Sequence, residues 1–201
     1  MSIFRKIFNS ITDPSSEVKE KDFADNQLNH NDLPVDEQFT FNFKKNGGKF
    51  LYCENVSELN EQFENILEEN DWFESEALCY ESKLFPLLQN NNIIFENIKN
   101  PTFLLTSCES LIAEDGSIMF SSNQIKQFKP FELPANIVLV TSTSKIVESK
   151  SDGLRKIKNQ YTSDYPTNIT TIKYFEKVKE EDFLHYGSTQ KNLYLLLLED
   201  L

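Results

Sequence analysis

The feature that most constrains the fold is the run NIVLVTS at residues 136–142. It is continuous and rich in β-branched residues, and it lacks the polar/apolar alternation of a strand with one face in water. Such runs are typical of strands buried on both faces, which occur mainly in parallel sheets covered by helices. A chain with this strand must therefore supply helices for both faces of a sheet.

The rest of the chain alternates strand and helix patterns with short connections. Further strands are predicted at 50–53, 77–80, 93–95, 103–106, 168–175 and 193–199, and around a turn at 111–113 and 118–120. Helices are predicted at 57–70 and 148–161, with a short helix or turn at 82–90. This alternation predicts an α/β domain of three layers, with a mostly parallel sheet and helices on both faces.

Some details of the helices are predicted as well. The segment around Phe39 and Phe43 is ambiguous, since its phenylalanines alternate as in a strand while Gly47-Gly48 resembles a helix stop, and a helix is favoured. Ser57 can cap the 57–70 helix. In the 148–161 helix, the apolar positions Leu154, Ile157 and Tyr161 are expected to face inward.

The chain divides into three parts. Residues 1–12 have apolar positions at helical spacing and predict a short amphipathic helix, which can pack on its own domain, fray, or dock on a partner or membrane. Residues 13–36 are polar, acidic and rich in turn formers, and they predict a linker in which His30 has no chemical role. Residues 37–201 form the α/β domain.

Charge and cysteine content exclude several classes of function. The net charge of −12 would repel phosphate backbones and anionic lipids, so nucleic acid is not an expected partner. The three cysteines form no CxxC pair, so neither a metal site nor a cofactor is predicted, and scattered thiols favour a reducing compartment. With no signal peptide and no transmembrane segment in the sequence, a cytoplasmic protein is expected.

Candidate site residues gather in the stretch TSCESLIAEDGSIMFSS, residues 106–122. Parallel sheets bind ligands at the carboxyl ends of their strands, where Thr106 is expected to lie. Thr106 and Ser117 offer hydroxyls, Glu109 and Glu114 offer carboxylates able to act as a base or bind a cation, and Gly116 permits a positive φ or close approach of a ligand. For Glu114, capping a helix or accepting amides in its turn is the structural alternative.

Cys108 lies in the same stretch and has two interpretations. Its polar neighbours are compatible with a nucleophile. No histidine nearby in the sequence would activate it, however, and a small packed thiol is favoured.

The segment TSCESLIAEDGS, residues 106–117, resembles the TGADxxIAETGT signature of the LUD-domain family, the lactate-utilisation proteins of LutC and YkgG type. Five positions match, and Glu109 and Ser117 are close substitutes; the matches are Thr106, Ile112, Ala113, Glu114 and Gly116. Gly47-Gly48, ELPANIVLV at 132–140 and Gly187 resemble further family features in the same order.

The resemblance implies a sheet like that of sugar-phosphate isomerases and CoA transferases, and an association with oxidation of L-lactate. The chain departs from the family near its end, where YFEKVKEEDFLHYGSTQK replaces the GPSxTxDIE and GxHGP motifs. His185 precedes Gly187 rather than following it, so the role of the family's histidine is not transferred.

Two hypotheses follow. In the first, the protein is a non-catalytic accessory or ligand-sensing component of L-lactate utilisation that binds a small anionic or carboxylate ligand and works beside iron–sulfur subunits. In the second, it is an enzyme acting on a small carboxylate or acyl-CoA-type substrate, with Glu114 as base or nucleophile. The ligand-binding residues expected in either case are Thr106, Glu109, Glu114, Gly116 and Ser117.

Overall fold

A computed structural model of the protein describes residues 33–175 and 191–200. A five-stranded sheet has the order β1-β9-β6-β3-β2, and all four neighbouring pairs are parallel. Its strands are β1 (Lys49–Cys53), β2 (Ala77–Leu78), β3 (Phe103–Thr106), β6 (Asn136–Ser142) and β9 (Asn192–Leu198). The predicted α/β class with a mostly parallel sheet flanked by helices is confirmed.

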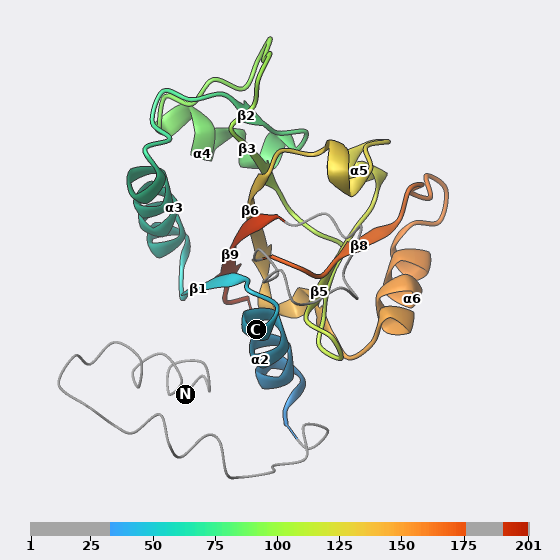
Figure 1. Ribbon diagram of the computed structural model, residues 1–201. Coiled ribbons are helices and arrows are strands. Elements are labelled where there is room, and N and C mark those ends of the chain that lie inside the picture. The colour runs from blue at the N-terminus through green and yellow to red at the C-terminus, as the bar shows by residue number, and fades with distance from the viewer. Residues whose placement is uncertain (1–32, 176–190, 201) are drawn as a thin grey trace, which may run out of the picture. The chain divides into compact units, whose positions relative to one another are not determined.

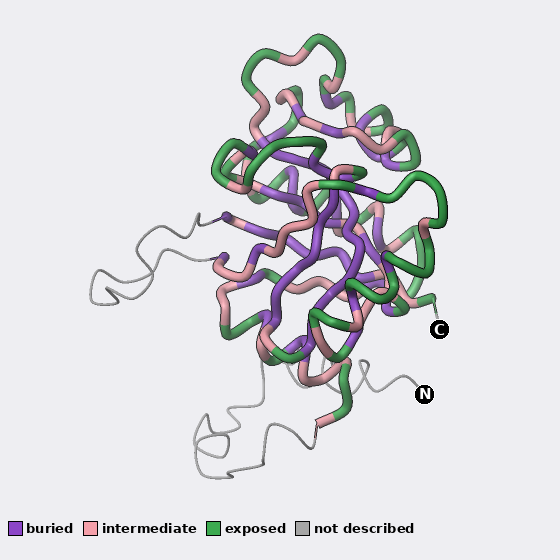
Figure 2. The backbone as a smooth tube through the Cα atoms, turned by 90° about the vertical axis from the view of Figure 1, so that its right-hand side faces the viewer, coloured by how far each residue is buried: buried purple, intermediate pink, exposed green. Residues whose placement is uncertain are grey.

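The run at 136–142 forms β6, the middle strand of this sheet. Ile137, Val138 and Leu139 are fully buried, although they point alternately to opposite faces of the sheet. Both faces are thus covered at this strand, as its composition predicted. Figure 2 shows the same burial along the central strands.

One face of the sheet packs against α3 (Val56–Asn70) and α4 (Phe85–Asn90) (Figure 1). Phe63 and Leu67 of α3 share a hydrophobic cluster with Phe103 and Leu196 of the sheet. Trp72, just after α3, stacks on Phe103 with ring centroids 5.1 Å apart. Apolar burial of this extent is the main stabilising contribution to the domain.

A second sheet and two helices lie on the side away from α3 and α4 (Figure 1). This four-stranded sheet has the order β7-β4-β5-β8, with β4 (Ser110–Ile112) and β5 (Ser117–Phe120) antiparallel. Its other strands are β7 (Ile146–Val147) and β8 (Thr170–Ile172), and the two helices are α2 (Val35–Lys45) and α6 (Lys150–Gln160). The strands predicted at 111–113 and 118–120 exist, but they form a hairpin outside the parallel sheet.

Short elements complete the described part of the fold. They are α5 (Ser122–Ile125) and three 3₁₀ turns, η2 (Ser82–Leu84), η3 (Pro130–Glu132) and η4 (Thr143–Lys145). The favoured helix around Phe39 and Phe43 is confirmed as α2, and Gly48 lies directly against the ring of Phe43.

Three local predictions were wrong. Asn55 caps α3, because its side chain accepts from Glu58 N at 3.0 Å, and Ser57 lies within the helix. Residues 93–95 form one bridge, between Ile94 and Glu76, and no strand. Leu154 is 43% exposed, because Gly153 occupies the inward position of α6 against Met119.

The helix predicted at 1–12, most of the 13–36 linker, and His30, His185 and Gly187 lie outside the described residues. Among the helices that are described, none has the length and apolarity needed to cross a membrane.

Candidate functional site

A cavity of about 290 Å³ opens at the carboxyl edge of the parallel sheet. Ser107 follows β3, Thr141 and Ser142 end β6, and Leu198 ends β9, and all four line it. The carboxyl ends of parallel strands are where open α/β sheets bind ligands. The cavity therefore lies where a functional site is expected, and it is small enough to suit a small molecule.

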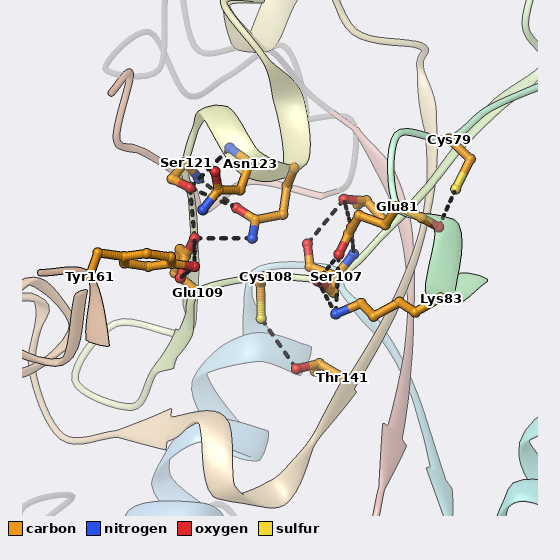
Figure 3. A network of polar contacts seen from close by, with 12 residues as sticks. Cys79, Glu81, Lys83, Ser107, Cys108, Glu109, Ser121, Asn123, Thr141 and Tyr161 are labelled. Atoms are coloured by element: carbon orange, nitrogen blue, oxygen red, sulfur yellow. Dashed lines mark hydrogen bonds and ion pairs between the residues drawn. The ribbon is translucent and has the colours of Figure 1, made fainter. Parts of the chain in front are cut away.

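Beside the cavity lies the Glu81 cluster, defined as Glu81, Lys83, Thr106 and Ser107, of which Lys83 and Ser107 line the cavity (Figure 3). Glu81 accepts hydrogen bonds from Ser107 N at 2.6 Å, Ser107 Oγ at 2.5 Å and Thr106 Oγ1 at 3.0 Å. Lys83 Nζ lies 3.2 Å from Glu81 Oε2 and donates to Ser107 Oγ at 3.1 Å. Burial raises the pKa of Glu81, but the hydrogen bonds from Ser107 and the charge of Lys83 outweigh it, so the pKa lies below its usual value.

A wall of the cavity contains the Glu109 cluster, defined as Glu109, Ser121, Gln124 and Tyr161. Ser121 caps α5 in a reciprocal capping box with Gln124. Both residues also donate to Glu109 Oε1, Ser121 Oγ at 2.6 Å and Gln124 Nε2 at 3.0 Å. Burial, followed by the charge of Glu109, raises the pKa of Tyr161, so its hydroxyl stays protonated and able to donate.

Cys108 lies between these two clusters (Figure 3). It is 3% exposed, and its thiol donates to Thr141 Oγ1 at 3.4 Å. Burial raises the pKa of Cys108 to about 12, so the thiolate is scarce at neutral pH. Of the two interpretations of Cys108, this geometry favours the small packed thiol over the nucleophile.

Lys145, the last residue of η4, lies at the rim of the cavity. In the described part of the chain, its Nζ makes no hydrogen bond or ion pair. Burial lowers the pKa of Lys156, and the charge of nearby Lys145 lowers it further. The ammonium of Lys145 thus has no direct carboxylate partner among the described residues, while the charge of Asp200 acts on neighbouring Lys156.

Asp200 fixes the turn that carries Lys145. Its carboxylate accepts from Thr143 Oγ1 and Ser144 N, both at 2.9 Å, and from Ser144 Oγ at 2.6 Å. Burial raises the pKa of Asp200, but these hydrogen bonds outweigh it and lower the pKa to about 2. The carboxylate is thus ionised at neutral pH and holds η4 against the end of β9.

The predicted site residues fall into two separate groups. Thr106 and Glu109 lie at the carboxyl end of β3, where Glu109 lines the cavity and Thr106 supports Glu81. Glu114, Gly116 and Ser117 lie at the far end of the β4–β5 hairpin and are not among the described residues that line this cavity. The 106–117 stretch thus spans both ends of one hairpin.

The bend at Glu114–Gly116 is occupied by neighbouring elements. Glu114 is exposed, and its carboxylate accepts a hydrogen bond of 3.0 Å from the backbone N of Lys150, the first residue of α6. It thus caps the N-terminal end of this helix, which was the structural alternative to a ligand-binding role. Gly116 has φ +67°, and a Cβ there would lie 2.4 Å from the backbone carbon of Asn42. Ser117 is fully buried and donates to Asp115 at 2.6 Å.

Sequence reasoning missed several residues of the cavity, chiefly Lys83, Lys145 and Tyr161, and also Glu81, which holds Lys83 and Ser107 in place. Each comes from a segment distant from the 106–122 stretch, and no local pattern marks it. The one available signal was position, because Thr141 and Ser142 are polar residues at the end of the otherwise apolar run 137–140. Within the described residues, no group of three or more His, Cys, Asp or Glu side chains is placed to hold a metal ion.

Comparison with known proteins gives one family and one solved structure. A sequence model for the LUD domain matches residues 37–198. A crystal structure of a DUF162 family protein from Deinococcus radiodurans has a similar fold, with a TM-score of 0.57 and 12% identity over 83% of this chain and 96% of that chain. Curated proteins gave no significant match.

Proposed function

The chain belongs to the LUD-domain family, and from this premise we propose that it is a non-catalytic accessory or ligand-sensing component of L-lactate utilisation. Its site in this proposal is the cavity at the carboxyl edge of the sheet, and its ligand is a small carboxylate. Glu109 is the predicted site residue that faces this ligand. The lactate association comes from the family resemblance, while the ligand class comes from the chemistry of the cavity.

The observation that carries the ligand class is the ammonium group of Lys145 at the cavity rim. Within the described chain it has no hydrogen bond or ion pair. A second ammonium, that of Lys83, also lines the cavity, where it is paired with Glu81. Ammonium groups hold a carboxylate in charge-assisted hydrogen bonds.

Binding without covalent chemistry is favoured by the state of the reactive groups. The thiol of Cys108 is protonated at neutral pH because burial raises its pKa to about 12. The carboxylate of Glu81 already accepts three hydrogen bonds and an ion pair, which hold its pKa low and make it a weak base. Both groups are thus suited to shaping a site rather than to attacking a substrate.

Calorimetric titration of the purified chain with propionate, pyruvate and L-lactate tests this proposal. We expect at least one of them to bind, and Lys145→Ala to weaken that binding by about tenfold or more, since a charge-assisted contact is lost. Lys99→Ala is the matched control, because this exposed lysine precedes β3 at the opposite edge of the sheet. Failure of all three acids to bind, or equal losses in both variants, would overturn the proposal.

The partners in this proposal are iron–sulfur subunits of lactate oxidation, in the cytoplasm. The three cysteines within the described residues are free and buried, which favours a reducing compartment. Affinity capture from lactate-grown cells is expected to recover an iron–sulfur oxidoreductase subunit. Capture without any redox protein would count against the accessory role.

The alternative, an enzyme for a small carboxylate or acyl-CoA-type substrate with Glu114 as base or nucleophile, has less support. Glu114 Oε1 is engaged by the backbone amide of Lys150, and its side chain is exposed away from the cavity lining. Glu114→Ala separates the two ideas. Loss of ligand binding in this variant, with Lys145→Ala unaffected, would favour the alternative.

A further inference from the structure

Glu109 is an unusual group to find in the wall of an anion-binding cavity. The residue is 4% exposed, and it lines the cavity. Its carboxylate is held by neutral donors only, and no Lys, Arg or His of the described residues forms an ion pair with it. A buried carboxylate without a cation is costly, because hydrogen bonds from neutral groups replace its hydration only in part.

The hydrogen bonds to Glu109 are unevenly divided between its two oxygens. Oε1 accepts from Ser121 Oγ at 2.6 Å and from Gln124 Nε2 at 3.0 Å. The Tyr161 hydroxyl lies 3.3 Å from Oε1 and 3.4 Å from Oε2, and its single proton can serve one of them at a time. Oε2 therefore keeps unused acceptor capacity at the cavity.

Charges of opposite sign meet across this cavity. Figure 3 shows Glu109 and Lys83 on opposite sides of Cys108. Burial is the main cause that raises the pKa of the Cys108 thiol. Nearby charges act on it as well: Lys145 lowers this pKa and Glu109 raises it. A molecule in the cavity thus meets both the ammonium group of Lys145 and a carboxylate with a free oxygen at Glu109.

Resting on the proposed function, we infer that the ligand of this cavity is a small zwitterion of the amino acid type. Its carboxylate binds at Lys145 and its ammonium group donates to Glu109 Oε2. The ammonium supplies the cation that the buried Glu109 lacks, and the volume of about 290 Å³ suits a molecule of this size. Glu109 is then the residue that determines specificity, while Lys145 supplies the general attraction for acids.

Three acids of matched carbon skeleton test this inference by calorimetry at pH 7. Propionate has no second polar group, L-lactate has a hydroxyl and L-alanine has an ammonium group. We expect L-alanine to bind the wild-type protein about tenfold or more tightly than propionate, and Glu109→Gln to abolish that preference while propionate binding changes less than about twofold. Glu64→Gln, at an exposed position of α3, is the control expected to keep the preference.

The outcomes separate this inference from the proposed function. Propionate binding as tightly as L-alanine, or L-lactate binding more tightly than L-alanine, would overturn the zwitterion and leave the carboxylate site standing. Absence of binding by all three acids would overturn both. The ligand series on the wild-type protein decides the matter even if Glu109→Gln does not fold.

Discussion

Asn42 Nδ2 donates a hydrogen bond of 2.8 Å to the carbonyl oxygen of Ala113, across 71 residues of sequence. Asn46, the residue directly after α2, donates in the same way to Asp115 O at 2.7 Å. These two amides hold the Glu114–Gly116 bend against α2 through its backbone. The part of the chain that most resembles the family signature is therefore also a structural junction between a helix and the β4–β5 hairpin.

Asn42→Ala should destabilise the domain by about 1–3 kcal/mol, because the Ala113 carbonyl is buried and would lose its donor. Urea unfolding monitored by circular dichroism measures the difference. Lys45→Ala, at an exposed position of α2, controls for general effects on the helix. An Asn42→Ala protein as stable as the wild type would show that the bend does not depend on this contact.

Gly116→Ala should cost more, about 2–4 kcal/mol. The residue has φ +67°, and the added Cβ would lie 2.4 Å from the backbone of Asn42, which cannot rotate aside. Gly153→Ala is the comparison, since its Cβ would meet only the ends of side chains, Met119 at 3.1 Å and Ile112 at 3.2 Å, and alanine favours the helix. Thermal unfolding of both variants should rank Gly116→Ala as clearly less stable; the reverse order would contradict the close approach at the bend.

Glu81→Gln should destabilise the protein by about 1–3 kcal/mol at pH 7, because the charged acceptor of Ser107 and Thr106 is lost. The folded-state pKa of Glu81 is lowered. Its contribution is therefore complete above the unfolded pKa of about 4.3 and is lost as pH falls through the folded value. Unfolding free energies between pH 7 and pH 3 should show the gap between wild type and variant closing on acidification; a constant gap would exclude this linkage.

The three thiols should react slowly with iodoacetamide in the native protein at pH 7.5. Burial raises the pKa of Cys53 and Cys108 to about 12 and that of Cys79 to about 11, so little thiolate is present. Mass spectrometry should find full alkylation only in denaturant. Rapid modification of Cys108 alone in the native state would instead support a nucleophilic role.

Much of the secondary structure followed from local patterns. The middle strand of the sheet, β6, was predictable because every residue of its core is apolar and β-branched or leucine, which only a doubly covered strand requires. The cap of α3 could not be predicted, since Asn55 and Ser57 are both good cap residues. The face of α6 that points inward could not be predicted either, because Gly153 faces inward only through its contact with Met119.

The sequence by itself determined the α/β class, the buried middle strand and the family signature at 106–117, because hydrophobic periodicity and short motifs are local properties. Only the tertiary structure decided which polar residues share a cavity. Lys83, Glu109, Lys145 and Tyr161 meet at the carboxyl edge because parallel strands bring their ends together across long sequence separations. Glu109 and Glu114, five residues apart in the chain, lie at opposite ends of a hairpin, because β4 carries the backbone between them away from the sheet edge.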